Sequence, residues 1–594
     1  MVTSGSDPEK TKQRIELRWA LRDWIAAAVL FVATACVILW QNAHVAVLWD
    51  LGYVLDSAAR FAAGQIPYRD FPIVHPPLTF MVQAAIMRFT GHVYFHHVMY
   101  VAAMGGMGTV LAWRIALTTL RRRAKAAWAM SLLLAAPLTV VGIYCVFPFP
   151  SYDCDCAFWI LVAVWALQRV GVGTRLGRGR EFGRGFLAGA ALFVPVLVKQ
   201  NMGLPFFVIA IIGVATLISI HNIWQMKDNN ISYEYFSLIM VLIGAGAALL
   251  AGAVGLELTA GIGNYLHWTV QFAGERRMPG LSAMLGVYLY PSLAWMLPCV
   301  VAGLAVLGVF HGKRWAQVAG FLMVAAPFVF PVIALVLYDD ADERGDSLLA
   351  IWPVMLVMAG VVALLNVYRH RRALGVRDLL PFVVLAAVNG TMMSQQLWGS
   401  TYAIWPLLIL LLAEMIACLD GLADTFGARW FAPAMVGLVS TMLLVCGGFY
   451  TASEERLSYV KFPDGPAVRS AFSSLKGMAT PGPYIPEFDE LLHYAAANIP
   501  FNDGIILIPG DEPFFFASGR APHFPVTLFD PTTDPYTPDE TATLVRTENI
   551  RWLVVKRDLQ INADPTPQRV ELMQALMSEF TPAAKLGGYD VYRR

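Results

Sequence analysis

Long apolar runs separated by short polar segments make up the first three quarters of the chain. Each run is long enough, or nearly so, for a helix across about 30 Å of hydrocarbon, which takes about 20 residues. The runs lie near 24–42, 94–119, 126–147, 155–170, 186–199, 203–221, 236–256, 286–310, 316–337, 348–367, 379–396, 402–418 and 430–450. This pattern predicts a polytopic α-helical membrane protein with about 13 transmembrane helices. A shorter apolar stretch, 76–90, is interpreted as a juxtamembrane or re-entrant helix on the outer side.

Arginine and lysine gather in alternate connections between these runs. The clusters lie near 121–125, 169–184, 313–314 and 369–377. Basic residues favour the cytoplasmic side of a membrane, so these connections and the N-terminal tail are expected there. The first run lacks a small-residue cleavage site and is interpreted as a retained span. An odd number of spans then puts the C-terminus outside, in a multi-pass protein of the cell (inner) membrane.

The pattern changes after residue 450. Short buried-strand patterns at 504–508, 552–555 and 589–592 alternate with helical patterns near 485–498, 538–549 and 566–580. Alternating strands and helices predict a small α/β domain, here extracytoplasmic. The predicted organisation is a cytoplasmic tail at 1–23, a transmembrane domain at 24–450 with its first outer loop at 43–93, and the α/β domain at 451–594.

The composition agrees with a membrane protein and excludes several function classes. Hydrophobic residues make up 57% of the chain and charged residues 14%, whereas soluble domains are about a quarter charged. A formal net charge of +1 gives no indication of nucleic-acid binding. The sequence has no Walker loop, Rossmann fingerprint or Gly-X-Ser-X-Gly elbow, which argues against nucleotide-driven transport and nucleotide cofactors.

Metal-ligand spacings are not evident, and no metal site is predicted. The histidines form no ligand pattern on one predicted helix. The acidic segment 339–346 offers oxygen ligands that would suit a divalent cation, but it lacks the spacing of a calcium loop. A solvated acidic loop is the simpler interpretation, so no cofactor is assigned beyond that candidate cation.

Polar residues are concentrated in the first outer loop. It contains Leu48-Trp49-Asp50-Leu51-Gly52-Tyr53, then Gly64-Gln65-Ile66-Pro67-Tyr68-Arg69-Asp70-Phe71, then His75-Pro76-Pro77-Leu78. A carboxylate just past the end of a span can accept a proton from a hydroxyl. In the alternative interpretation Asp50 caps a juxtamembrane helix and Asp70 pairs with Arg69 or Arg60.

The order of these residues resembles the first loop of GT-C-fold glycosyltransferases, most closely the protein O-mannosyltransferase and aminoarabinose-transferase-like group. Two later segments match in the same order. They are Ser151-Tyr152-Asp153-Cys154-Asp155, which opens a span, and Gly189-Ala190-Ala191-Leu192 through Lys199. The resemblance extends over most of the membrane region and implies a GT-C-like fold.

The resemblance implies an enzyme that takes a sugar from a polyprenyl-phosphate carrier and transfers it outside the cytoplasm, usually with inversion. It implies that Asp50 is the catalytic base and that Asp153 or Asp155 is a second acidic position. Tyr68, Arg69 and His75 would then bind substrate. Leu51 departs from the family, which often has Glu there. His75 stands where the aminoarabinose branch has a lysine, which argues against a simple aminoarabinose transferase.

The chemistry also needs cations, because a phosphate departs from the sugar. Candidates at outer-side ends or loops are Lys199, Arg276, Arg277 and Arg344. Alternatively, Lys199 extends to the interface with its charge in water, and Arg276 and Arg277 form a solvated loop with Glu275.

The resemblance, together with these residues, implies a hexosyl- or pentosyltransferase with a polyprenyl-phosphate-linked sugar donor and a hydroxyl acceptor on a protein, a glycan or a lipid. The lipid bilayer is the other expected partner, and nucleic acid is not. Two alternatives stay open. One is a transporter or flippase of a lipid-linked sugar, and the other is a non-catalytic membrane scaffold whose outer domain binds a partner.

Overall fold

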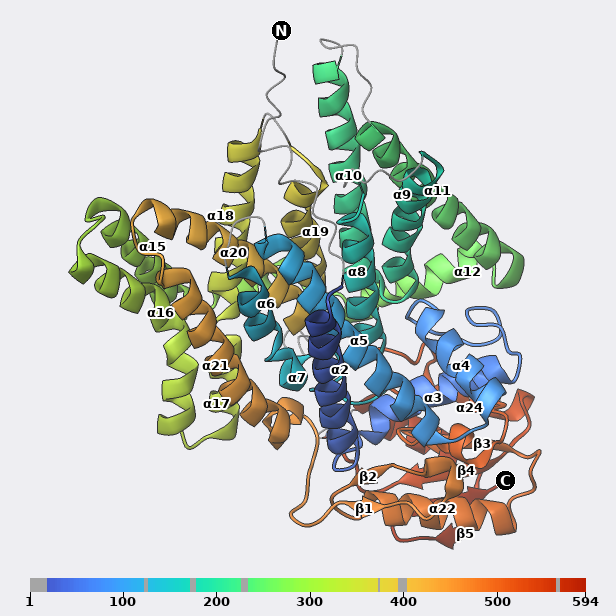
Figure 1. Ribbon diagram of the computed structural model, residues 1–594. Helices are drawn as coiled ribbons and strands as arrows, with labels where there is room; N and C mark the ends of the chain where they lie inside the picture. The colour runs from blue at the N-terminus through green and yellow to red at the C-terminus, as the bar shows by residue number, and fades with distance from the viewer. Residues whose placement is uncertain are drawn as a thin grey trace.

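The computed structural model describes residues 19–121, 126–170, 178–225, 233–371, 374–393, 403–561 and 567–594. Within these ranges, helices form the chain up to Ala452 and every named strand follows it (Figure 1). Most of the predicted tail and parts of three of the four basic connections, near 121–125, 169–184 and 369–377, lie outside the described residues.

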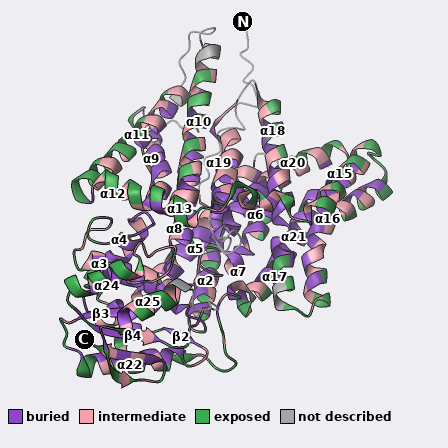
Figure 2. Cartoon of the chain, turned by 180° about the vertical axis from the view of Figure 1, so that it is seen from behind, coloured by how far each residue is buried: buried purple, intermediate pink, exposed green. Residues whose placement is uncertain are grey.

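Eight helical segments are long and apolar enough to cross a membrane by length and composition. They are α2 (Leu21–Asn42), α5 (Tyr94–Leu120), α10 (Gln200–Gln225), α11 (Tyr233–Thr259), α16 (Arg314–Leu337), α17 (Ala341–Leu349) with α18 (Trp352–His370), α20 (Trp405–Thr425) and α21 (Phe431–Ala452). Large apolar side chains such as Leu322 and Val336 are exposed on α16, and the outer faces of α15 and α16 are coloured exposed in Figure 2. Such faces suit contact with lipid, and the chain is a multi-pass membrane protein.

The count of about 13 spans is larger than these eight, although the other five predicted segments are also helical. Proline interrupts two of them, because it removes a backbone donor: Pro137 precedes α7, and Pro195 lies in η1. The five segments form α6 (Ala127–Ala135) with α7 (Leu138–Val141), α8 (Tyr152–Leu167), α9 (Arg178–Phe193) with η1 (Val194–Leu197), α15 (Leu293–Val309) and α19 (Val376–Thr391). In the described residues none of these helices is longer than 17 residues.

Two helices form the first loop. They are α3 (Leu48–Ala62) and α4 (Leu78–Thr90), the second of which lies where a helix was predicted near 76–90. Leu48, Leu51 and Leu55 of α3 are fully buried in a core that also contains side chains of the C-terminal region. In Figure 1, α3 and α4 lie between the long helices and that region.

The segment between α11 and α15 is built from short helices. They are α12 (Ile262–Leu266), the π-helix η2 (His267–Phe272), α13 (Ala273–Arg277), α14 (Leu281–Met284) and η3 (Gly286–Leu289). Trp268 of η2 donates its indole N–H to the backbone oxygen of Tyr68, 3.2 Å away. The segment therefore contacts the first loop.

The C-terminal region is a small α/β unit, as predicted. Its sheet has the order β3-β4-β6-β5, with β3 parallel to β4 and the other pairs antiparallel. Helix α24 lies in the crossover between the parallel strands, as this connection requires. Its elements are η5 (Glu454–Leu457), β1 (Val468–Arg469), η6 (Ser473–Leu475), β2 (Ala479–Thr480), α22 (Tyr484–Asn498), β3 (Gly504–Ile508), α23 (Phe514–Ser518), α24 (Pro538–Thr547), β4 (Ile550–Lys556), α25 (Pro567–Met577), β5 (Thr581–Lys585) and β6 (Tyr589–Arg593).

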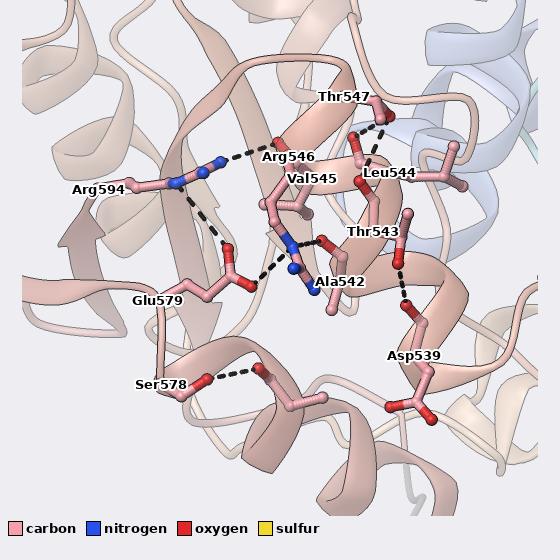
Figure 3. A network of polar contacts seen from close by, with 11 residues as sticks. Asp539, Ala542, Thr543, Leu544, Val545, Arg546, Thr547, Ser578, Glu579 and Arg594 are labelled. Atoms are coloured by element: carbon pink, nitrogen blue, oxygen red, sulfur yellow. Dashed lines mark hydrogen bonds and ion pairs between the residues drawn. The ribbon is translucent and has the colours of Figure 1, made fainter.

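Polar contacts fix the end of the chain to this unit. The Glu579 carboxylate pairs with Arg546 at 3.0 Å and with Arg594 at 3.9 Å, and Arg594 also donates to the backbone oxygen of Val545 at 3.4 Å (Figure 3). These contacts connect α24, the segment after α25 and the last residue. Arg594 is therefore held against α24 and the segment after α25.

Candidate active site

Asp50 lies in the first turn of α3, at the junction of the helical and C-terminal regions. A carboxylate is favourable there because it faces the positive end of the helix dipole. The side chain is half-buried, and the Tyr459 hydroxyl donates a hydrogen bond to its Oδ2 atom at 3.0 Å. Burial raises the pKa of Asp50 to about 6; the bond from Tyr459 opposes this rise, and the Asp153 carboxylate adds to it. The group is thus largely ionised at neutral pH, yet basic enough to accept a proton.

A buried ion pair lies within electrostatic reach of Asp50. Asp153, in the first turn of α8, pairs with the ammonium group of Lys199, which precedes α10. Both side chains are almost completely buried. The Lys199 ammonium group also lies 5.2 Å from the centre of the Tyr152 ring, within the range of a cation–π contact. Two predicted site residues, distant in sequence, are therefore in direct contact.

His75 connects this ion pair to the first loop. Its Nδ1 atom lies 2.9 Å from the Tyr53 hydroxyl, and its ring stacks on Tyr152 with centroids 3.9 Å apart. Burial lowers the pKa of His75 well below its usual value, and the positive charges of Arg277 and Lys199 lower it further. His75 is therefore neutral at physiological pH, and the two cations lie within electrostatic reach of it.

The neighbouring arginines of α13 have different surroundings. Arg277 is half-buried and acts electrostatically on both Tyr53 and His75. Arg276 is exposed and donates to the backbone oxygen of Pro531 in the C-terminal region at 3.1 Å. Only Arg277 is thus brought to the group around His75.

Tyr68 supports the loop around His75. Its hydroxyl donates to the His75 backbone oxygen at 2.7 Å, and its own backbone has a positive φ of 67°. Arg69 instead points away into solvent, where it pairs with Asp70 at 2.8 Å. This ion pair agrees with the alternative interpretation of the sequence, in which Asp70 pairs with Arg69 or Arg60.

Asp155 makes a different set of contacts from Asp153. It accepts hydrogen bonds from Thr79 at 2.8 Å, Tyr100 at 2.8 Å and Tyr144 at 2.6 Å. These hydroxyls use both oxygens of the carboxylate and connect α4, α5 and α8. Asp155 thus has the contacts of a structural residue, and Asp153 is the acidic residue next to the cation.

Arg344 lies in α17, where its guanidinium group donates to the backbone oxygen of Tyr338 at 2.6 Å. The acidic segment around it begins a helix: Asp340 caps α17 by accepting from the Glu343 backbone N–H at 3.0 Å. Among the side chains that the structure describes, no group of three or more His, Cys, Asp or Glu has a metal-holding arrangement. The side chains of residues 341 and 342 lie outside that set.

Sequence reasoning missed the contribution of the C-terminal region. Tyr459 contacts Asp50 from a position 409 residues away. A Cβ atom added to Gly52 would lie 2.5 Å from the Asp511 backbone oxygen, so the glycine permits a close approach of α3 to this region. A glycine on the buried face of a short helix is the one local signal of this contact.

No known family model and no curated protein matches the chain. Solved structures with a similar fold include ArnT from Cupriavidus metallidurans bound to undecaprenyl phosphate, at 14% identity over 96% of this chain and 98% of that one, with a TM-score of 0.46. The oligosaccharyltransferase of Archaeoglobus fulgidus matches at 10% identity over 89% of this chain and 68% of its own, with a TM-score of 0.42. The Pmt1–Pmt2 protein O-mannosyltransferase of S. cerevisiae matches at 20% identity over 42% and 36%, with a TM-score of 0.32.

Proposed function

We propose that this chain is a membrane glycosyltransferase that moves a sugar from a polyprenyl-phosphate carrier to an acceptor hydroxyl, with Asp50 as general base. The observation that carries the proposal is one arrangement of groups: a half-buried carboxylate beside a buried Asp153–Lys199 pair, with His75 and Arg277 adjoining. The donor class follows from the resemblance of the first-loop residues.

The base is assigned to Asp50 because it is the carboxylate at this site with an accessible surface. Asp153 is almost completely buried and already pairs with Lys199. In the proposed step, the acceptor oxygen attacks the anomeric carbon while its proton passes to the Asp50 carboxylate. A single displacement of this kind inverts the anomeric configuration.

The leaving group is assigned to the two cations within electrostatic reach of His75. The bond between the anomeric carbon and the phosphate oxygen breaks, and its electron pair stays with the polyprenyl phosphate. Lys199 and Arg277 stabilise the charge that develops there. Because Asp153 pairs with Lys199, Arg277 is the cation proposed to make the main contact with the phosphate.

The test is donor turnover by the purified full chain in lipid. The wild-type protein, given a labelled polyprenyl-phosphate sugar and an acceptor, should release carrier phosphate. Asp50→Asn should lower this release by about 10³-fold or more, since it removes the base without changing its size. Asp539→Asn, at an exposed position of α24, is the matched control and should turn over normally.

Two results would count against the proposal. Normal turnover by Asp50→Asn would show that another group is the base. Movement of intact sugar lipid across the bilayer, with no donor consumed by the wild-type protein, would support the transporter interpretation instead.

A further inference from the structure

Tyr459 lies in the segment that joins the last span to the C-terminal unit. It lies two residues after the end of η5, and its hydroxyl donates to Asp50 Oδ2 at 3.0 Å. The residues around it are fixed: Leu457 and Val460 are buried in the core shared with α3. The ring is thus held by packing on both sides of its position in the chain.

The same segment is hydrogen-bonded to the start of α3 through Gln560. The Lys461 backbone N–H donates to the Gln560 backbone oxygen at 2.6 Å. The Gln560 side chain accepts from the Leu48 backbone N–H and donates to the Ala46 backbone oxygen, both at 2.8 Å. Tyr459 and the first turn of α3, which contains Asp50, are therefore fixed relative to each other.

We infer that Tyr459 is a positioning residue for the proposed reaction, whose hydroxyl orients the Asp50 carboxylate and keeps it ionised. The inference rests on the proposed function. It makes the C-terminal region part of the active site, since the hydroxyl comes from the segment anchored in that region. Tyr459 acts through Asp50 and is not assigned a contact with substrate.

The charges around Asp50 support this role. The titratable groups facing it are Tyr459 from the C-terminal segment, with Tyr152 and Asp153 from α8. Burial and the Asp153 charge both disfavour the ionised carboxylate, whereas the bond from Tyr459 favours it. Burial also raises the pKa of Tyr459, and the Asp50 charge adds to the rise, so this hydroxyl remains a donor.

The test is the pH profile of kcat/KM for donor turnover in Tyr459→Phe, which keeps the ring and removes the hydroxyl. The midpoint of the acidic limb should rise by about one pH unit, because a hydrogen bond to the ionised form is lost. Turnover at pH 6 should fall about fivefold and should recover at high pH. Tyr494→Phe is the matched control, since this ring packs against the same core and its hydroxyl makes no hydrogen bond to a described residue; its profile should match that of the wild type.

The inference is overturned if the acidic limb of Tyr459→Phe has the same midpoint as that of the wild type, whether or not the rate falls uniformly. This outcome is distinct from failure of the proposed function. If the proposed function fails, Asp50→Asn retains turnover, and the acidic limb of the wild-type pH profile does not depend on Asp50.

Discussion

At the scale of the residue, environment separates carboxylates that look alike in the sequence. Asp153 and Asp155 are two positions apart, yet one pairs with a lysine and the other accepts from three hydroxyls. Both were candidates for one role because the sequence shows neither partner. The resemblance of the first loop directed attention to Asp50, but only the fold shows that Tyr459 contacts it.

The Asp153–Lys199 pair gives a prediction about stability. Lys199→Met or Asp153→Asn alone should lower the free energy of unfolding by about 3 kcal/mol, because each leaves a buried group without its partner. The double variant should recover part of that loss, since neither buried charge remains. Thermal unfolding of the purified variants measures this.

Turnover separates the structural effect of this pair from its role in the reaction. The double variant should remain inactive even where its stability is restored, because Lys199 is assigned to the leaving phosphate. A double variant less stable than either single variant would show that the two groups do not compensate each other's burial.

At the scale of the element, hydrophobic pattern alone predicted the strands of the C-terminal region, and β3, β4 and β6 lie at the expected positions. The same pattern also predicted spans at five helices that are shorter than the eight candidate spans, and proline interrupts two of these five, before α7 and in η1. The hydrophobic pattern does not predict which elements pack against each other. Asp56 of α3 accepts backbone N–H bonds from Phe515 at 3.2 Å and Phe516 at 2.7 Å, across 459 and 460 positions.

This docking contact should depend on pH. Burial raises the pKa of Asp56 from 3.8 to about 7, although the amides of Phe516 and Phe515 oppose the rise. Between these two pH values the folded chain therefore retains a proton on Asp56 that the unfolded chain has lost. The contribution of Asp56 to stability is present below about pH 4 and is lost as the pH rises through about 7. The full difference is roughly 4 kcal/mol.

Thermal unfolding between pH 4 and pH 8 checks this sign in wild type and Asp56→Asn. The amide cannot ionise, so wild type should lose stability relative to the variant as the pH rises. A gain in the relative stability of the wild type over this range would mean that the amides outweigh burial and that the pKa of Asp56 is lowered.

At the scale of the whole molecule, the proposed site lies where three parts of the chain meet. The first loop supplies Asp50 and His75, the helical region supplies Asp153 and Lys199, and the C-terminal segment supplies Tyr459. The first loop and the C-terminal region share one core at one end of the molecule (Figure 1). The assignment of this end to the outside of the cell remains a prediction from the positions of the basic residues.

The central claim is that one site holds a base and, separately, cations for the carrier phosphate. Binding of polyprenyl phosphate to the wild type, Asp50→Asn and Arg277→Gln tests it most directly. The account predicts an unchanged or tighter Kd for Asp50→Asn, which removes a negative charge, and a Kd weaker by about tenfold or more for Arg277→Gln. Loss of carrier binding in Asp50→Asn, with normal binding in Arg277→Gln, would contradict it.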